Sequence, residues 1–242
     1  MLVDVIPIVD EVKNENLYKK TVIIVDILRT SSTIITALAN GIEWIIPAET
    51  IGQVKTIKNI ETSALLAGDR FSKKIQEFDL GNSPLEYTSL PLKNKKIILT
   101  TTNGTRAIQK AGKGEYIFIG GFLNGASCIQ KALKLKRDIV ILCVGNRNEF
   151  ALEDGLAAGF LIDTLMKNSD QAYEINDFGK AVYGMYKYYE DKLTDILKTT
   201  ETAKRLTQLG FGDDIHFSSQ INYYSVCPKY DPSKNMIKPS SD

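Results

Sequence analysis

Short apolar runs alternate with helical patterns through the first two thirds of the chain. The segment 21–27, TVIIVDI, is a continuous β-branched run typical of a strand covered on both faces. Repetition of such runs, each followed by a helical pattern, predicts βα units and an α/β fold with a largely parallel or mixed central sheet. We expect strands at residues 2–8, 21–27, 44–47, 63–67, 96–99, 116–119 and 138–144, and helices at residues 31–40, 51–60, 105–111, 126–135 and 152–166.

Two stretches depart from this pattern. Residues 71–95 have no regular periodicity, and an irregular stretch of this length inside a compact domain is usually functional. After the βα series, a tyrosine-rich helical pattern favours a helical insertion around residues 177–209, followed by a final strand near Ile215 and a polar tail over residues 232–242. We interpret residues 1–242 as a single domain.

Charge and hydropathy narrow the class of partner. The 242 residues include 30 basic and 29 acidic side chains, so no global field favours nucleic acid or an anionic membrane, and any anion must be bound locally. No apolar run approaches the roughly 20 residues that cross a bilayer. The N-terminus lacks the basic start and small-residue cleavage site of a signal peptide. We therefore expect a cytoplasmic protein that binds neither nucleic acid nor membrane.

The inventory of reactive side chains narrows the chemistry. One histidine is too few for a histidine-based zinc site and removes most imidazole triads. None of the three cysteines is followed six residues later by an arginine, as a cysteine phosphatase requires, and we expect buried, inert thiols. Carboxylates, amides, hydroxyls and guanidinium groups remain, and this set suits phosphate and a hard oxygen-bound cation.

Polar side chains follow the predicted strand at residues 21–27. Ligands of open α/β sheets bind at the carboxyl ends of the strands, and this end supplies Asp26, Arg29, Thr30 and Ser31. A carboxylate there can ligate a cation, and the following helix start can bind an anion. The alternative is that Ser31 only caps the helix. Capping does not explain a charged aspartate within a run that is otherwise buried.

A second polar cluster follows the predicted strand at residues 96–99. Its candidate anion-binding residues are Asn103, Gly104, Thr105 and Arg106. Gly104 would let the backbone approach an oxyanion closely, and Arg106 could donate to two phosphate oxygens. An ordinary Asn-Gly turn is the alternative, but it would not need the arginine.

Further candidates follow the remaining strands and the irregular segment. Asn124 follows a glycine-rich loop and could be only a helix cap, whereas Arg147 follows the strand at residues 138–144. Glu153 and Asp154 open a helix, where the dipole favours acids, and they are also candidate magnesium ligands. The irregular segment and the strand before it supply Asp69, Arg70, Asn82 and Ser83. We expect these loops to converge in one pocket.

Five motifs occur in a fixed order between about Val22 and Gly159. They are V-D-I-L-R-T-S-S-T, G-D-R, F-D-L-G-N-S-P-L-E, T-T-N-G-T-R and L-E-D-G-L-A-A-G, and weaker similarity continues through R-L-x-x-L-G-F-x-x-D near the C-terminus. In this order they resemble the 2-phosphosulfolactate phosphatase family, the ComB proteins.

This resemblance implies a three-layer α/β/α fold and a Mg²⁺-dependent acid phosphatase. Members release phosphate from 2-phospho-3-sulfolactate to give 3-sulfolactate, a step in coenzyme M biosynthesis. The resemblance places eight residues in the site: Asp26, Arg29, Asn82, Asn103, Thr105, Arg106, Glu153 and Asp154. We assign Asp26, Arg29, Glu153 and Asp154 to catalysis. The three acids of this group would hold Mg²⁺, and Arg29 and Arg106 would bind anionic groups.

The chain departs from the family pattern at two places. Asp69 stands where members often have glutamate, which keeps the carboxylate. The sequence Thr200-Glu201-Thr202-Ala203 stands where a Ser-x-His-Gly pattern is expected. The second departure weakens the substrate assignment more than the reaction class.

Two other functions compete with this interpretation. A haloacid-dehalogenase-type phosphatase needs a second aspartate two residues after the first, and that position is Leu28. A non-catalytic anion-binding protein could use the same scaffold and dispense with the paired acids at residues 153 and 154. In either case the tyrosine-rich segment could form an interface in a homo-oligomer.

Overall fold

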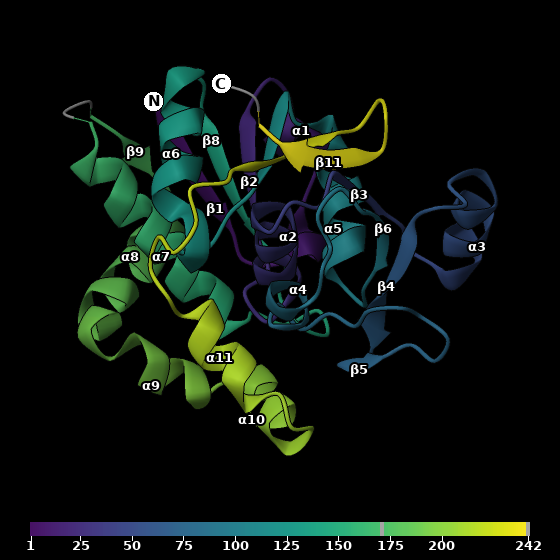
Figure 1. The fold of residues 1–242 in the computed structure, drawn as a ribbon. Coiled ribbons are helices and arrows are strands. Elements are labelled where there is room, and N and C mark those ends of the chain that lie inside the picture. The colour runs from purple at the N-terminus through teal and green to yellow at the C-terminus, as the bar shows by residue number, and fades with distance from the viewer. Residues whose placement is uncertain (170–171, 241–242) are drawn as a thin grey trace.

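The computed structural model describes residues 1–169 and 172–240, and in this part of the chain eleven strands form one sheet (Figure 1). The order across the sheet is β5-β4-β6-β3-β11-β10-β7-β2-β8-β1-β9. The strands are β1 (Leu2–Ile6), β2 (Thr21–Val25), β3 (Trp44–Pro47), β4 (Leu65–Arg70), β5 (Lys73–Lys74), β6 (Lys96–Thr100), β7 (Tyr116–Ile119), β8 (Ile139–Cys143), β9 (Glu174–Ile175), β10 (Pro228–Asp231) and β11 (Met236–Pro239).

Helices follow most of the strands. The α-helices are α1 (Asn14–Leu17), α2 (Thr30–Ala39), α3 (Ile51–Ile60), α4 (Glu86–Ser89), α5 (Gly104–Lys110), α6 (Gly125–Lys134), α7 (Leu152–Lys167), α8 (Asp177–Tyr189), α9 (Leu193–Lys198), α10 (Glu201–Gln208) and α11 (Gly212–Ser218). Short 3₁₀ helices are η1 (Val9–Glu11), η2 (Ala111–Lys113), η3 (Phe122–Asn124) and η4 (Glu190–Lys192). Figure 1 shows α9, α10 and α11 grouped at one end of the molecule, away from the β10–β11 hairpin.

Strand β2 faces a hydrophobic core on each side. Ile23 and Val25 pack with side chains of α6, α7 and α8. Val22 and Ile24 point the other way and pack with side chains of α2 and α5. The fold is therefore a three-layer α/β/α arrangement, as predicted.

The sheet consists of two parallel halves joined by an antiparallel hairpin. Strands β4, β6 and β3 are parallel, and so are β7, β2, β8, β1 and β9. Between them lies the β10–β11 hairpin, which pairs antiparallel with β3 on one side and with β7 on the other. Three successive antiparallel pairings give the two halves opposite senses, so the sheet is mixed.

The carboxyl ends of β2 and β6 meet although their half-sheets run in opposite senses. The hydroxyls of Thr30, just after β2, and Thr101, just after β6, are hydrogen-bonded to each other, with their Oγ1 atoms 3.3 Å apart. Neighbouring strands are rotated by about 20–25°, so the five steps from β2 to β6 turn the strand direction by roughly 100–125°. Ile97 of β6 packs in the same core as α2 and α5, so the sheet curls around these helices. The curl brings polar strand ends of both halves together.

The C-terminal part corrects two predictions. The final strand predicted near Ile215 is wrong, because residues 212–218 form helix α11, in which Ile215 and Phe217 are buried. The predicted polar tail, whose last two residues lie outside the described part, contributes β11 to the centre of the sheet. Its polarity concealed this role, since Ile237 alone in β11 is buried. The predicted helical pattern over 177–209 is confirmed as α8 to α10, whereas its status as an insertion stays a prediction.

Two compositional expectations can be compared with the structure. All three cysteines are free and buried, as predicted. Within residues 1–169 and 172–240, no helix is both long and apolar enough to span a bilayer.

Candidate active site

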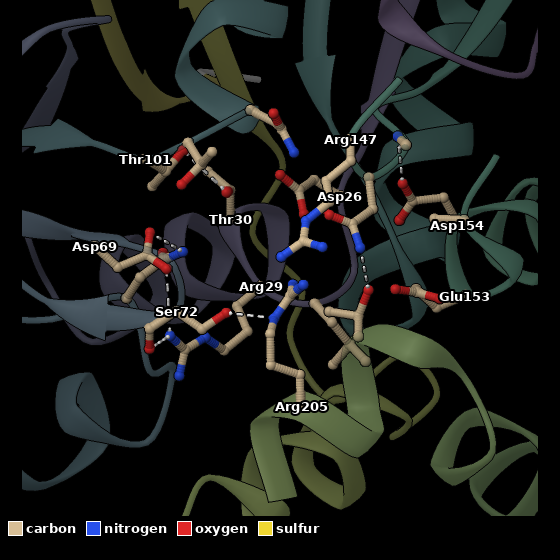
Figure 2. A pocket seen from close by; sticks show the side chains of 18 of the residues that line it. Asp26, Arg29, Thr30, Asp69, Ser72, Thr101, Arg147, Glu153, Asp154 and Arg205 are labelled. Carbon is tan, nitrogen blue, oxygen red and sulfur yellow. Dashed lines mark hydrogen bonds and ion pairs between the residues drawn. The ribbon is translucent and has the colours of Figure 1, made fainter. Parts of the chain in front are cut away.

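One pocket gathers polar residues from the ends of β2, β4, β6 and β8 and from helices α7 and α10 (Figure 2). Its lining includes four carboxylates, from Asp26, Asp69, Glu153 and Asp154. It also includes three guanidinium groups, from Arg29, Arg147 and Arg205. Thr30, Asn82 and Asn103 complete the set of predicted residues that the structure brings to the pocket. The predicted convergence of distant loops is therefore observed for these residues.

Asp26 directly follows β2, and its carboxylate accepts hydrogen bonds at the first residue of α2, Thr30. Burial raises the pKa of its carboxyl to about 6; hydrogen bonds from the Thr30 side chain and backbone N–H lower it, and the charges of Asp69 and Glu153 raise it. The helix start, which we expected to bind an external anion, thus already donates to a carboxylate of the protein. Asp26 is held in place by this contact while its edge faces the pocket.

The two acids at the start of α7 differ in their contacts. Asp154 Oδ1 accepts from Ile27 N at 2.9 Å and Oδ2 accepts from Gly145 N at 3.0 Å, so this carboxylate ties the ends of β2 and β8 together. Burial raises the pKa of Asp154 well above its usual range, and the charges of Asp26 and Glu153 add to the effect. The Glu153 carboxylate, 3% exposed, makes no hydrogen bond or ion pair with the described residues. Glu153 therefore keeps its oxygens available to a ligand.

The donor atoms of the pocket suit a magnesium ion held partly by water. Among residues 1–169 and 172–240, no three acidic, histidine or cysteine side chains are grouped closely enough to hold a metal. Asn82, however, lines the pocket and has a buried Oδ1 without a partner, while its Nδ2 donates to Asp69 Oδ1 at 3.3 Å. Mg²⁺ takes oxygen ligands, needs one or two carboxylates and keeps several waters. The residues therefore fit such an ion better as a sparse set of oxygen ligands than as a three-carboxylate cage.

Arg29 is buried, and both terminal nitrogens of its guanidinium contact protein acceptors. Nη1 donates to Asp214 Oδ2 at 2.9 Å, and Nη2 donates to the backbone oxygen of Ser72 at 2.9 Å. Asp69 lies 3.5 Å away as a second ion-pair partner, and the ring of Phe211 lies under the guanidinium at 4.5 Å. Arg29 thus connects β2, β4 and α11 and forms the floor of the pocket.

Three predicted residues lie behind the pocket wall. Ser31 Oγ accepts from Asp26 N at 2.9 Å, and Thr105 Oγ1 donates to Thr101 O at 3.2 Å, so both hydroxyls fix local backbone. Gly104 does permit a close approach, but to protein atoms. A Cβ at this position would lie 2.3 Å from Thr30 Oγ1 and 2.6 Å from Asp26 Oδ2. The missing side chain of Gly104 therefore lets the start of α5, after β6, pack closely against the residues that follow β2. We call this contact the seam between the two half-sheets.

Two more predicted residues make structural contacts. Ser83 Oγ donates to Asp214 Oδ1 at 2.6 Å, which supports the acid that holds Arg29. Asn124 Nδ2 donates to Ile119 O at 3.1 Å and to Val226 O at 3.0 Å, so its amide joins η3 to the C-terminal segment. Neither side chain lines the pocket.

Two predicted arginines also lie outside the pocket. Arg70 donates to Asp69 O at 2.8 Å and to Thr100 Oγ1 at 2.9 Å, between the ends of β4 and β6. Arg106 pairs with Asp10 on the surface, and its side chain is 43% exposed. The structure therefore does not place Arg106 where an anion bound in the pocket could meet it.

Sequence reasoning missed several residues of the α10–α11 segment. Arg205 and Thr202 line the pocket from α10, and Asp214 and Phe211 hold Arg29. Arg205, Phe211 and Asp214 all belong to the motif R-L-x-x-L-G-F-x-x-D, which carried a signal without an assigned role. Thr202 lies in the second departure from the family pattern, so that departure falls within the pocket wall.

The fold and the pocket define an α/β/α protein with a mixed-charge pocket at the strand ends. The family model described as 2-phosphosulpholactate phosphatase matches residues 6–233, and the chain belongs to this family. A relative from Caldanaerobacter subterraneus subsp. tengcongensis, named "Probable 2-phosphosulfolactate phosphatase", is 37% identical over 235 residues, 96% of each chain. Relatives with the same name from Clostridium novyi and Clostridium tetani are 38% and 35% identical over 95% of this chain and 97% of their own lengths. The predicted resemblance is confirmed.

Proposed function

We propose that this chain hydrolyses 2-phospho-3-sulfolactate to 3-sulfolactate and phosphate, with Mg²⁺ as cofactor. Membership of the family supports the reaction and the substrate. The structural observation that carries the proposal is the meeting of Asp26 and Glu153 with Arg147 and Arg205 in one pocket. A phosphatase needs such a mixed set, because it must bind a highly anionic ester and also activate water beside it.

The acidic side of the pocket would hold the cofactor. Asp26, Glu153 and the Asn82 amide oxygen would be its protein ligands, and Asp154 would keep the two strand ends at their spacing. When bound there, Mg²⁺ supplies positive charge to the non-bridging phosphate oxygens.

The other polar groups would orient the ester. Thr101, Thr102 and Asn103, at the end of β6, present hydroxyl and amide donors to phosphate oxygens. The attacking water must lose a proton. Of the four pocket carboxylates, Asp69 is paired with Arg29 and Asp154 accepts two backbone hydrogen bonds, so Asp26 or Glu153 would accept the proton. Asp26, with a pKa of about 6, is largely ionised at neutral pH and can do so.

Each of the two competing functions makes a prediction that differs from the proposed one. The haloacid-dehalogenase alternative gains nothing from the pocket, because Leu28 still occupies the position of the second aspartate. A non-catalytic anion binder would bind 3-sulfolactate but release no phosphate from the ester. Cytoplasmic location, a step in coenzyme M biosynthesis and a homo-oligomer through the tyrosine-rich segment stay predictions beside the proposed reaction.

The test is phosphate release by the purified protein. We expect turnover of 2-phospho-3-sulfolactate in Mg²⁺, loss of turnover in EDTA, and recovery when Mg²⁺ is returned in excess. Glu153→Gln should lower kcat by at least about 100-fold, as losses of groups acting on the transition state do. Glu43→Gln, an exposed carboxylate before β3, serves as the matched control. Full turnover in EDTA would refute the cofactor, and no turnover under any condition would refute the reaction.

A further inference from the structure

The three guanidinium groups of the pocket differ in how far their charge is compensated. Arg29 lies against two carboxylates, those of Asp69 and Asp214. Neither Arg147 nor Arg205 forms an ion pair with any residue in 1–169 or 172–240. Arg205 is half-buried, so a ligand anion would offset the cost of removing its unpaired charge from water, whereas Arg147 is exposed to solvent. These two arginines are therefore the pocket cations whose charge is free to pair with a ligand anion, and Arg205 has the larger need for one.

Arg205 is also fixed in direction. Its Nε donates to Ser72 Oγ at 3.2 Å, and the backbone oxygen of Ser72 in turn accepts from Arg29 Nη2 at 2.9 Å. Ser72 is itself buried, so the anchor of Arg205 is part of the pocket floor. With Nε held, the two Nη groups form a fork suited to two oxygens of one acidic group. Glu201, the acid on the same helix, is already paired with Lys204 at 3.2 Å.

Arg147 faces this fork from another part of the fold. It lies on the loop after β8, whereas Arg205 comes from α10, and Figure 2 shows both side chains reaching into the pocket. The carboxylates of Asp26 and Glu153 line the same pocket. A ligand that spans the pocket can therefore place one anionic group at the acids and their cation and another at the arginines.

We propose that Arg205 is the specificity residue that binds the acidic group of the substrate that is not transferred, with Arg147 as its partner across the pocket. The ligand chemistry is a carboxylate or sulfonate on the carbon skeleton of a phosphate ester. Arg205 thereby selects esters that carry a second anion over plain phosphate monoesters. The identity of the substrate in this assignment rests on the proposed function. The binding of a second anionic group by Arg205 does not depend on it.

The first test uses four related esters. They are 2-phospho-3-sulfolactate, the analogue without the sulfonate (2-phospholactate), the analogue without the carboxylate, and isopropyl phosphate, which lacks both. Arg205→Gln should lower kcat/KM for the full substrate by about 10–100-fold, the cost of losing a charge-assisted hydrogen bond. The loss should shrink to less than about threefold for isopropyl phosphate. If the loss also disappears on 2-phospholactate, Arg205 binds the sulfonate. If it disappears on the analogue without the carboxylate, Arg205 binds the carboxylate.

A second test needs no turnover. 3-Sulfopropanoate carries both acidic groups and no phosphate, and its Kd is measured by calorimetry. We expect binding by the wild-type protein, at least tenfold weaker binding by Arg205→Gln, and an intermediate Kd for Arg205→Lys, which keeps the charge but not the fork. Lys204→Gln removes the same charge from the adjacent position of α10 and should bind like the wild type. Thermal melting of each variant separates loss of binding from loss of fold.

The two tests fail independently. If the protein turns over no ester but Arg205→Gln weakens 3-sulfopropanoate binding, the reaction is wrong and the anion site stands. If the wild type turns over the substrate but Arg205→Gln lowers kcat/KM equally for all four esters, Arg205 does not select the second anion. Absence of 3-sulfopropanoate binding by the wild type would likewise overturn the assignment.

Discussion

On one side of the pocket, Asp26, Glu153 and Asp154 form an acidic wall in which no member is ion-paired with a described residue. On the other side, Arg29 lies between the carboxylates of Asp69 and Asp214, with Phe211 under its guanidinium. Both regions bury charge at strand ends of the same sheet. In the acidic wall, neighbouring side chains carry the same charge. Around Arg29, neighbouring side chains carry opposite charges.

This difference in neighbouring charge predicts that the acidic wall destabilises the fold, whereas the Arg29 cluster stabilises it. Burial and mutual repulsion raise the pKa of Asp26 and Asp154, so ionisation of the acidic wall works against folding. Burial also raises the pKa of Asp69 and Asp214 in the Arg29 cluster, but there the charge of Arg29 opposes the rise, so that removing Arg29 would leave uncompensated buried charge. Substitutions in the two regions should therefore change stability in opposite directions.

The largest expected effect comes from Arg29. Arg29→Met would leave the buried carboxylates of Asp69 and Asp214 without their cation, and removing one partner of a buried pair costs about 3–5 kcal/mol. We expect this loss in urea denaturation at pH 7.5. The matched control is Arg137→Met, because the pair of Arg137 with Glu115 is partly exposed and should cost about 1 kcal/mol or less. A loss for Arg29→Met no larger than that control would show that the cluster does not stabilise the fold.

The next effect tests the seam where the two half-sheets meet. Gly104→Ala would insert a Cβ that lies 2.3 Å from Thr30 Oγ1, so α2 and α5 must move apart. Overpacking of this kind costs about 1–3 kcal/mol. It should also lower kcat/KM, because Thr30 positions Asp26.

A second glycine supplies the control for this experiment. Gly184 lies in α8, and a Cβ added there would have no other atom within 4 Å, so Gly184→Ala should be neutral or stabilise by up to about 1 kcal/mol. Both variants are compared by thermal melting and turnover. If Gly104→Ala behaved like Gly184→Ala, the close approach at the seam would be wrong.

Asp26→Asn should change stability with the opposite sign. Because the pKa of Asp26 is raised from 3.8 to about 6, the folded protein binds this proton more tightly than the unfolded chain does. The stability from this group is present below about pH 4 and is lost as pH rises through about 6. We therefore expect Asp26→Asn to match the wild type near pH 4 and to be more stable by about 1–3 kcal/mol at pH 7.5 without added metal.

This experiment also probes the cofactor without measuring activity. Mg²⁺ should raise the Tm of the wild type, because a ligand that binds only the folded state stabilises it. The rise should be smaller for Asp26→Asn, which has lost a charged ligand. A stability difference that does not depend on pH would contradict the raised pKa, and an equal Mg²⁺ effect on both proteins would remove Asp26 from the metal site.

The contrast between the two regions also explains what the sequence could predict. Asp26, Glu153 and Asp154 follow strands of one parallel half, where local pattern alone locates the carboxyl ends. The meeting with Thr101 and Asn103 could not be derived in this way, since it depends on the β10–β11 hairpin and on accumulated twist. Strand pattern predicted that the polar strand ends converge, and the family resemblance supported it, but neither predicted that the two half-sheets run in opposite senses.

The arginines were harder to assign because their roles depend on distant partners. Arg29 was correctly placed in the pocket, but the acid that holds it, Asp214, lies 185 residues along the chain. Arg205 has no local feature that distinguishes it from any helical arginine until Ser72 and the pocket are in place. Arg106, predicted to bind an anion, lies outside the pocket for a geometric reason. It lies two residues after Gly104 in α5, and about 100° of rotation per residue turns it to the opposite face of the helix.

Arg106 gives the smallest expected effect and the sharpest check on that geometry. Its contact with Asp10 is a surface ion pair, so Arg106→Ala should change stability by no more than about 1 kcal/mol. Turnover should stay within about twofold of the wild type, because the side chain does not line the pocket and is paired with Asp10. Assay of Arg106→Ala beside Arg205→Gln on the same substrate compares an arginine outside the pocket with one inside it. A loss above tenfold for Arg106→Ala would mean that α5 presents a different face when substrate binds, and Arg106 would then rejoin the anion-binding residues.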